Sequence, residues 1–188
     1  MLHFNFTPFP LLKTERLVLR QAAVIDAPEI FFLRSDPGVL KYIGREPATS
    51  IEDAYQFLQI IDDAATNNTG ISWSIALKEN NKMIGTIALW KLTPEHHRGE
   101  IGYVLHPAYQ GKGIMHEAMA AVIDYAFSAM KLHSIEAKIN PENLASQRLL
   151  ERNNFVREAY FRENYYYKGQ FFDSAIYSLL TPVKEKVE

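Results

Sequence analysis

The sequence contains no cysteine, which excludes disulfide bonds, thiolate nucleophiles and cysteine-based metal sites. It also lacks an excess of either charge: 20 Lys and Arg against 22 Asp and Glu give a formal net charge of -2, which offers no general attraction for nucleic acid. No apolar run approaches the ~20 residues of a membrane-spanning helix. We therefore expect a cytoplasmic protein with no direct nucleic-acid partner and no membrane partner.

The first 15 residues lack the pattern of a signal peptide, because Pro8 and Pro10 interrupt them and no basic segment comes first. The chain has 188 residues, enough for one well-buried core, so we expect a single domain over 1–188 with its core at about 13–180. The only histidine cluster is His96-His97. Two adjacent loop histidines without a third ligand do not make a metal site, so no metal is assigned.

The most informative stretch combines a strand, a glycine-containing loop and a long helix. Alternating apolar residues predict a strand over Glu100–Leu105, which ends before Pro107. Apolar residues at helical spacing predict an amphipathic helix over His116–Met130. Between them lies Gln110–Gly113, with the sequence Gln-Gly-Lys-Gly.

This loop has the chemistry of an anion site. Its two glycines allow the backbone to approach a ligand closely, and the N-terminus of the following helix offers unpaired N–H groups and a partial positive charge. A phosphate or pyrophosphate would suit it. Lys112 adds a cation, or is simply a solvated lysine. The spacing matches neither a P-loop nor a dinucleotide-binding fingerprint, and a tight turn is the alternative interpretation.

The remaining pattern predicts an α/β (α+β) fold, in which a mixed, mostly antiparallel sheet has helices on both sides. Expected strands cover 14–21, 72–78, 83–90, 133–139, 155–161 and 171–180. Expected helices cover 26–34, 49–65 and 144–152, with a short helical turn at 39–43. Asp26 is expected to cap the first helix, and Thr49 with Glu52 has the spacing of a capping box. The charged tail 181–188 is expected to fray.

The run Gln110–Met115 resembles the [Q/R]-x-x-G-x-[G/A] acyl-CoA loop of the GNAT N-acetyltransferases. The preceding strand EIGYVL, and Asn143-x-x-Ser146 followed by RLLERNNF, resemble the branch that acetylates the N-terminal alanine of ribosomal proteins. The resemblance extends from Lys13 to Leu180. Two residues depart from it: Met115 stands where the pattern has Gly or Ala, and Asn154 stands where it has Gly. Asn tolerates the left-handed turn that ends a helix.

The resemblance implies the GNAT fold, splayed at its central strands, and acetyl-CoA as the co-substrate. The backbone of Tyr103, Val104 and Leu105 would pair with the pantetheine arm, and Asn143 and Ser146 would contact the arm and its thioester. The pyrophosphate would be held by Gln110, Gly111, Lys112, Gly113, Ile114, Met115 and His116.

Acetyl transfer from a thioester to an amine needs an acceptor for the ammonium proton and a donor for the leaving thiolate. The resemblance implies Glu100 as the base; the alternative is an exposed strand-end carboxylate paired with Arg98 or Lys91. Ser146 is the candidate acid, in competition with tyrosines at 160 and 165–167. Asn143 and Ser146 would also be explained as the cap and first turn of a helix.

The aromatic residues of 160–172 could line an acceptor pocket or a dimer contact, but we expect them to form the core of a terminal hairpin. The preferred hypothesis is an N-acetyltransferase, monomeric or homodimeric, that acts on a peptide N-terminus. Alternatives are acetylation of a small amine (a polyamine, amino acid or antibiotic), a non-catalytic acyl-CoA-binding module, and a nucleotide-binding protein. The fold by itself does not select the acceptor.

Overall fold

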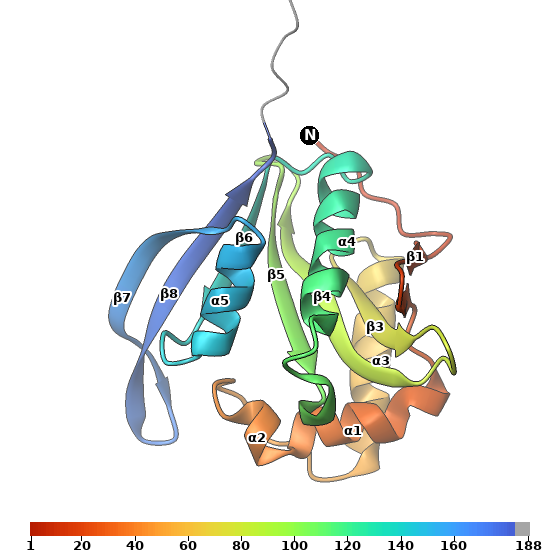
Figure 1. The fold of residues 1–188 in the computed structure, drawn as a ribbon, viewed down its shortest axis with the longest axis horizontal. Coiled ribbons are helices and arrows are strands. Elements are labelled where there is room, and N and C mark those ends of the chain that lie inside the picture. Colours follow the sequence, from red (N-terminus) through yellow and green to blue (C-terminus); the bar gives the residue numbers. More distant parts are fainter. Residues whose placement is uncertain (183–188) are drawn as a thin grey trace, which may run out of the picture.

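The computed structural model describes residues 1–182 (Figure 1). These residues form one eight-stranded sheet with the order β1-β2-β3-β4-β5-β6-β8-β7. The strands are β1 (Leu12–Lys13), β2 (Leu17–Arg20), β3 (Ile71–Leu77), β4 (Met83–Thr93), β5 (Arg98–Leu105), β6 (Ser134–Ile139), β7 (Val156–Tyr167) and β8 (Gln170–Leu180). The helices are α1 (Ala27–Ser35), α2 (Pro37–Leu40), α3 (Ile51–Thr66), α4 (Ile114–Ser128) and α5 (Leu144–Arg152), with 3-10 turns at Val24–Asp26 and Pro107–Tyr109.

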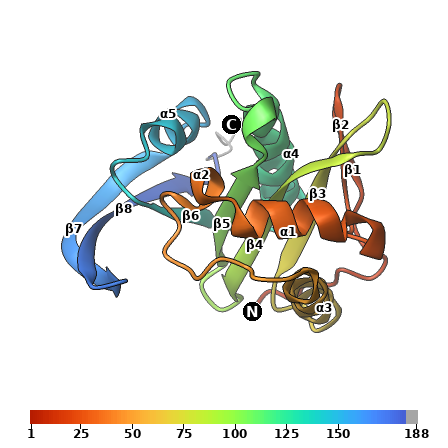
Figure 2. The ribbon, with the colours of Figure 1, turned by 90° about the horizontal axis from the view of Figure 1, so that it is seen from below.

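Helices cover both faces of the sheet. Figure 2 shows α4 and α5 on one side and α1 and α3 on the other. The apolar side of α4, including Met119, Val122 and Ala126, packs with Trp73 in the larger core cluster. A smaller cluster joins α1 and α3 to Met83 of β4. All neighbouring strands pair antiparallel except β5 and β6, which pair parallel. The predicted mixed sheet with helices on both sides is confirmed.

Several predicted boundaries need correction. The capping box belongs to Ser50 and Asp53 rather than Thr49 and Glu52, because the Asp53 carboxylate accepts hydrogen bonds from the backbone N–H of Thr49 (2.7 Å) and of Ser50 (3.2 Å). The short helix begins at Pro37, after Asp36, whose carboxylate accepts from the N–H of Val39.

The first predicted strand is shorter than expected. Only Leu17–Arg20 of 14–21 is in β2, and Leu12–Lys13 forms a separate short strand. Asp26 occupies the N-cap position of α1 but makes no capping hydrogen bond with its side chain. Its carboxylate instead pairs with both terminal nitrogens of Arg20, at 2.7 and 2.8 Å, and accepts from the N–H of Ala23. The ion pair therefore fixes the entry to the helix.

The terminal hairpin differs most from expectation. Its strands β7 and β8 are joined at Lys168-Gly169, where both residues have positive φ. Of its aromatic side chains, four are 48% to 62% exposed, so the prediction that the run packs as core is wrong for these: Tyr160, Phe161, Tyr166 and Phe171.

Two predictions about the rest of the chain can also be compared with the structure. Asn154, where the family pattern has Gly, has φ 64°, which confirms the expected left-handed residue after α5. Within residues 1–182, no helix is long and apolar enough to cross a membrane. The prediction that the tail 181–188 frays falls mostly on residues 183–188, which lie outside the described residues.

Candidate functional site

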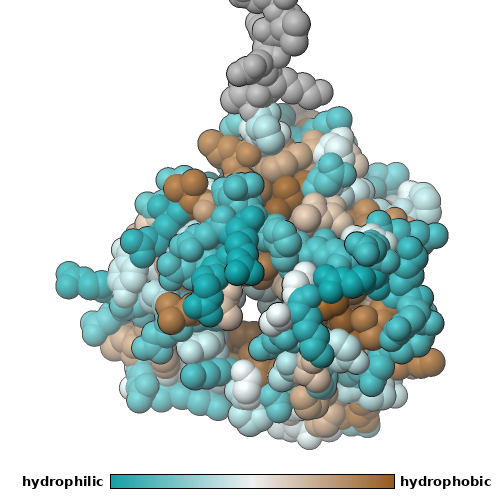
Figure 3. All heavy atoms as spheres, viewed as in Figure 1, coloured by the Kyte–Doolittle hydropathy of each residue, from teal (hydrophilic) through white to brown (hydrophobic). Residues whose placement is uncertain are grey.

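The site is built around the divergence of β5 and β6. The two strands pair over only three positions, from Arg98 opposite Ser134 to Glu100 opposite Glu136. Beyond Glu100, β5 continues beside β4 as far as Leu105, while β6 continues beside β8. One backbone edge of the second half of β5 therefore faces a gap. In the space-filling view the molecule is hollowed at this place, between the α4 side and the α5 side (Figure 3). The splay expected from the resemblance is confirmed.

The glycine loop lies at the open end of this splay. Gly111 and Gly113 have φ of 72° and 74°, in the left-handed region that glycine adopts without strain. Gly113 is the N-cap of α4, and no side chain caps the helix. The first-turn N–H groups of α4 are therefore available to an anion. The side-chain amide of Gln110 donates to the carbonyl of Leu105 at 3.1 Å, which ties the loop to the end of β5.

Neighbouring side chains fix the loop from behind, and sequence reasoning missed them. The Arg16 guanidinium donates to the carbonyl of Lys112 at 3.0 Å and pairs with the Glu117 carboxylate at 2.6 Å. Thr14 donates to the same carboxylate at 2.5 Å. Burial raises the pKa of Glu117, but the hydrogen bonds from Thr14 and Arg16 outweigh it and lower that pKa below its ordinary value. These partners are about 100 positions apart in the chain, so no local motif could have indicated them.

Of the remaining residues of the predicted cofactor loop, some have buried side chains and others have exposed side chains. Ile114 and Met115 are buried, at 5% and 8% exposure, so only their backbone can reach a ligand. The departure at Met115 is therefore accommodated by the core. His116 is exposed. The Lys112 ammonium donates to the carbonyl of Ala108 at 2.9 Å, which directs this cation back along its own loop.

On the side of the sheet that carries α4 and α5, the splay brings Tyr103 and Ser146 together. The Tyr103 hydroxyl is buried and has no hydrogen-bond partner of acceptable geometry among the described residues. Burial raises the pKa of Tyr103 to about 12, against a smaller opposing effect of the Ser146 hydroxyl. Tyr103 is thus protonated at neutral pH, and its hydroxyl can donate a hydrogen bond to a ligand. Sequence reasoning assigned only its backbone to the site.

Asn143 and Ser146 confirm the capping interpretation. The Asn143 side-chain oxygen accepts a hydrogen bond from the N–H of Ser146 at 3.1 Å, at the start of α5. The Ser146 hydroxyl is half-buried beside Tyr103. The cap therefore fixes the position of Ser146 through its backbone N–H and does not engage its hydroxyl.

Glu100 lies where β5 and β6 separate. It is 8% exposed, and its carboxylate pairs with the ammonium of Lys91 at 2.7 Å. Lys91 lies at an irregularity in the pairing of β4 and β5, with φ 44°. Such bulges commonly redirect a side chain beside a functional site. Of the two partners considered from sequence, Arg98 pairs instead with Glu136. The carboxylate is paired as the alternative supposed, but it is buried rather than exposed.

Glu100 and Tyr103 point to opposite faces of the sheet. Along β5, Tyr103 packs against the larger core cluster, whereas Val104 packs against the cluster of α1 and α3. Because side chains alternate along a strand, Glu100 shares the face of Val104. Leu105, which follows Val104, is buried and is the last residue of β5. The arrangement can thus place donors on one side of a thioester and a carboxylate on the other.

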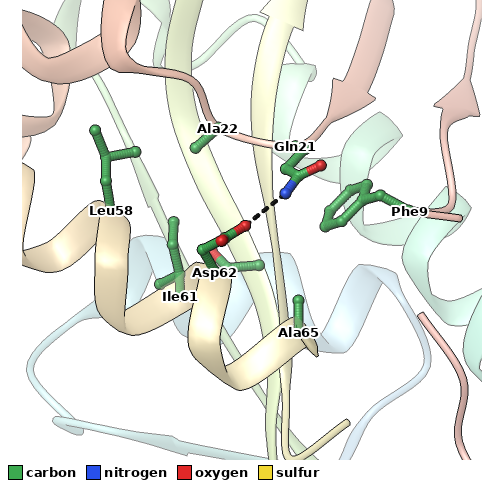
Figure 4. Close-up of a pocket in the computed structure, with 8 residues that line it drawn as sticks. Phe9, Gln21, Ala22, Leu58, Ile61, Asp62 and Ala65 are labelled. Carbon is green, nitrogen blue, oxygen red and sulfur yellow. Dashed lines mark hydrogen bonds between the residues drawn. The ribbon is translucent and has the colours of Figure 1, made fainter. Parts of the chain in front are cut away.

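A separate cavity between α3 and the neighbouring strands is too small to be a ligand site (Figure 4). Its volume is about 10 Å³, close to the minimum for one water molecule. The Gln21 amide donates to the Asp62 carboxylate at 2.6 Å across it. The splay, with its uncapped helix and unpartnered hydroxyl, is the site that fits a cofactor with an anionic end and a polar arm.

Comparison with known proteins agrees with this geometry. Residues 16–156 match the family model described as an acetyltransferase (GNAT) domain. The chain is 37% identical over 174 residues to the uncharacterized N-acetyltransferase YoaA of Bacillus subtilis, covering 93% of this chain and 98% of that protein. A crystal structure of a GNAT-family acetyltransferase from Bacillus anthracis has a TM-score of 0.80 at 32% identity, covering 91% of this chain and 98% of that one.

Relatives with named acceptors differ from one another. The [ribosomal protein uS5]-alanine N-acetyltransferase of Escherichia coli is 36% identical over 86 residues, which is 46% of this chain and 44% of that protein. The spermidine N(1)-acetyltransferase of Vibrio cholerae is 24% identical, over 84% of this chain and 89% of that protein. Enzymes of the matched family use acetyl-CoA. The family match, the splayed sheet and the glycine loop lead to one conclusion: this chain belongs to the GNAT family of N-acetyltransferases.

Proposed function

We propose that this N-acetyltransferase moves the acetyl group of acetyl-CoA directly to the primary amine of a peptide N-terminus, with Glu100 as the proton acceptor. The observation that carries the proposal is the position of Glu100 as the last residue of β5 that pairs with β6. A thioester whose arm follows the free edge of β5 would have its carbonyl near this point. The carboxylate is buried and lies on the face opposite the cofactor loop, from which an acceptor could approach.

Each participating group has one role in the proposed reaction. Glu100 takes the proton that the acceptor ammonium loses, directly or through a water, so that the amine can attack the carbonyl carbon. The N–C bond forms as the C–S bond breaks. Ser146 or Tyr103 donates the proton that the leaving thiolate needs. The first turn of α4 and the loop Gln110–Gly113 hold the pyrophosphate, and the backbone of 103–105 aligns the arm. Positioning of this kind contributes ~7–11 kcal/mol to such reactions.

The roles of the two hydroxyls are consistent with their surroundings. Tyr103 has a pKa of about 12, so it is protonated at neutral pH and can donate. Ser146 lies beside it, and either hydroxyl could supply the proton that the leaving sulfur needs. Among the tyrosines considered from sequence, Tyr160 donates to Asp173 instead, and Tyr167 donates to the carbonyl of Arg45. Their protons are therefore engaged elsewhere.

Release of free thiol from acetyl-CoA tests the proposal, with peptides, polyamines and aminoglycosides as acceptors. We expect peptides to be acetylated and Glu100→Gln to lower kcat by ~100-fold or more, which is the usual contribution of general base catalysis. The activity that remains should shift to higher pH, where more of the amine is already neutral. Glu136→Gln is the matched control, because it removes an ion-paired glutamate at the same register of the neighbouring strand.

Three outcomes would contradict parts of the proposal. Equal losses in the two variants would show that ion pairing, not proton transfer, explains the effect at Glu100. Turnover of polyamines but not of peptides would replace the proposed acceptor with a small amine. Binding of acetyl-CoA without thiol release from any acceptor would refute the proposed reaction.

A further inference from the structure

Two arginines on the α1–α3 side of the molecule have no carboxylate partner among the described residues. Arg34 lies in the last turn of α1, and Arg45 lies in the segment between α2 and α3. The Nε atoms of both guanidinium groups are buried without a hydrogen-bond partner. Within residues 1–182 neither arginine has a carboxylate within ion-pair distance. Both side chains are half-buried, and a guanidinium Nε that is buried is ordinarily hydrogen-bonded, so two such neighbours point to an anion that joins them from outside the protein.

Within the part of the chain that the structure describes, no carboxylate forms an ion pair with either charge. Burial and, to a smaller extent, the nearby charge of Arg34 together lower the pKa of Arg45 to about 10. Burial also lowers the pKa of Arg34, against a smaller effect of Asp53. The Asp53 carboxylate is already occupied, because it accepts hydrogen bonds from Thr49 and Ser50 at the start of α3. Arg34 is held by stacking on Phe57, with 4.0 Å from its guanidinium carbon to the ring centre.

The position of the pair relates it to the proposed acceptor side. The segment between α2 and α3 crosses the molecule on the side opposite α4 and α5 (Figure 2). Tyr167 of β7 donates to the carbonyl of Arg45 at 2.6 Å, which joins this segment to the far half of the sheet. At the other end, Phe32 of α1 stacks on His106, directly after β5, with 4.5 Å between ring centres. The arginines therefore lie near the open end of the splay, on the face toward which Glu100 points.

The separation between Glu100 and the pair sets the size of the acceptor. From Glu100 to the end of β5 at Leu105 the strand advances about 17 Å, at ~3.4 Å per residue. Because arginine side chains are long, they can reach back toward Glu100, so the distance that the acceptor must cover is shorter than this advance. An extended peptide with its amine at Glu100 would therefore bring about its third to sixth residue to the guanidinium groups. A polyamine of the same length would bring a second positive charge there, where two arginines would repel it.

We propose that Arg34 and Arg45 bind a carboxylate of the acceptor, so that the enzyme prefers amines that carry an acidic group several residues from the amine. The inference rests on the proposed function, since it assumes that the acceptor amine lies at Glu100. Two arginines can hold a carboxylate with charge-assisted hydrogen bonds, and the planar guanidinium suits this geometry. The carboxylate can come from an acidic side chain of a peptide or from the terminal carboxylate of a short peptide.

The test measures kcat/KM by thiol release for a peptide set. Each peptide is an alanine-rich hexamer with an amidated C-terminus and one Glu, moved from position 2 to position 6; the reference has Gln in its place. A free-carboxylate tetrapeptide and spermidine complete the set. We expect Glu at one or two positions between 3 and 6 to raise kcat/KM about 10- to 100-fold over Gln, as expected for a hydrogen-bonded ion pair. A preference for the free-carboxylate tetrapeptide alone would assign the terminal carboxylate as the source.

Variants then connect the preference to the two arginines. Arg45→Gln and Arg34→Gln should reduce the Glu/Gln ratio of kcat/KM toward 1. Arg152→Gln, which removes an exposed arginine at the end of α5, should keep the ratio of the parent protein. Using a ratio separates acceptor recognition from general loss of stability, and thermal unfolding checks that each variant is folded.

The outcomes distinguish this inference from the proposed function. Turnover of neutral peptides with no preference for Glu at any position would overturn the role of the arginines and leave the peptide acetyltransferase in place. Loss of affinity for acetyl-CoA in the arginine variants, with the Glu/Gln ratio unchanged, would assign the pair to the cofactor and also overturn the inference. Absence of turnover with every peptide would refute the proposed function itself.

Discussion

The glycines of the cofactor loop permit a sharp test, because an added methyl group would meet almost nothing in the protein. A Cβ at position 111 has no heavy atom within 4 Å, and one at position 113 meets only an Arg16 nitrogen at 3.5 Å, an ordinary contact. Alanine at either position would therefore cost only its left-handed backbone conformation, about 1–2 kcal/mol. For a protein of this size, that cost lowers Tm by about 2–4 °C per kcal/mol.

Gly169 provides a matched control. It has φ 82°, and a Cβ there meets only the Tyr166 hydroxyl, at 4.0 Å. Gly169→Ala should therefore lose about as much stability as Gly111→Ala, at a turn on the other half of the sheet. The backbone strain of the two substitutions is equal, and only their distance from the cofactor loop differs.

The expected difference lies in the affinity for acetyl-CoA. Either relaxation of the strained loop or the methyl group itself would disturb the N–H groups that face the pyrophosphate. We expect Gly111→Ala and Gly113→Ala to raise the KM for acetyl-CoA at least tenfold, which corresponds to about 1.4 kcal/mol, and Gly169→Ala to raise it less than twofold. Thermal unfolding and initial-rate kinetics measure both quantities. If KM rises equally in all three variants, or in none, the assignment of this loop to the cofactor is wrong.

Three further predictions concern single side chains. Tyr103→Phe removes a buried hydroxyl that has no hydrogen-bond partner among the described residues, so the free energy of unfolding should stay equal or rise. Because the hydroxyl is proposed to bond the substrate, kcat/KM for acetyl-CoA should fall about tenfold. Tyr125→Phe is the control, and the same kcat/KM in both variants would refute the proposed role of the Tyr103 hydroxyl. The pKa of Glu117 is lowered on folding from its ordinary 4.5, so its contribution to stability is present above pH 4.5 and is lost as pH falls through the lower folded value. Glu117→Gln should therefore flatten the acid side of a plot of Tm against pH; an unchanged plot would contradict the assignment. Arg45→Met should raise the free energy of unfolding by about 1 kcal/mol, because it removes a half-buried charge whose buried Nε has no hydrogen-bond partner among the described residues. Denaturant unfolding that shows a clear loss would indicate a partner within the protein.

Local sequence patterns predicted the elements that local interactions define. The helix 144–152 was predicted with the correct bounds because Asn143 caps it and Asn154 takes the left-handed turn beyond it. The capping residue of α3 was misplaced by one position, since Thr49 and Ser50 each have an acidic residue three positions later and the pattern alone does not choose between them. The structure chooses Ser50 through the hydrogen bonds of Asp53.

The parts of the site that sequence could not predict depend on contacts between distant segments. The partners of Glu117 come from the connection between β1 and β2, and the Tyr103 hydroxyl lies beside an α5 side chain. The two arginines come together only after α1 and the following segment fold back. No periodicity or fixed spacing in the sequence indicates these contacts. The glycines at 111 and 113 were recognisable because a left-handed backbone restricts the residue type at its own position.

The hydrogen bond between Tyr167 and the carbonyl of Arg45 has a mechanical consequence. The half of the sheet formed by β6, β8 and β7 pairs with the other half over only three positions of β5. Besides the core cluster that both halves share, the contact at Arg45 joins them at the far side of the gap, beside the ion pair of Lys168 and Glu46. Attachments at opposite ends of an opening restrict its width more than attachments at one end do. The spacing available to an acceptor would then depend on a tyrosine in the terminal hairpin, which lies outside every residue assigned to chemistry, and shortening that hairpin would alter substrate selection without touching the reacting atoms.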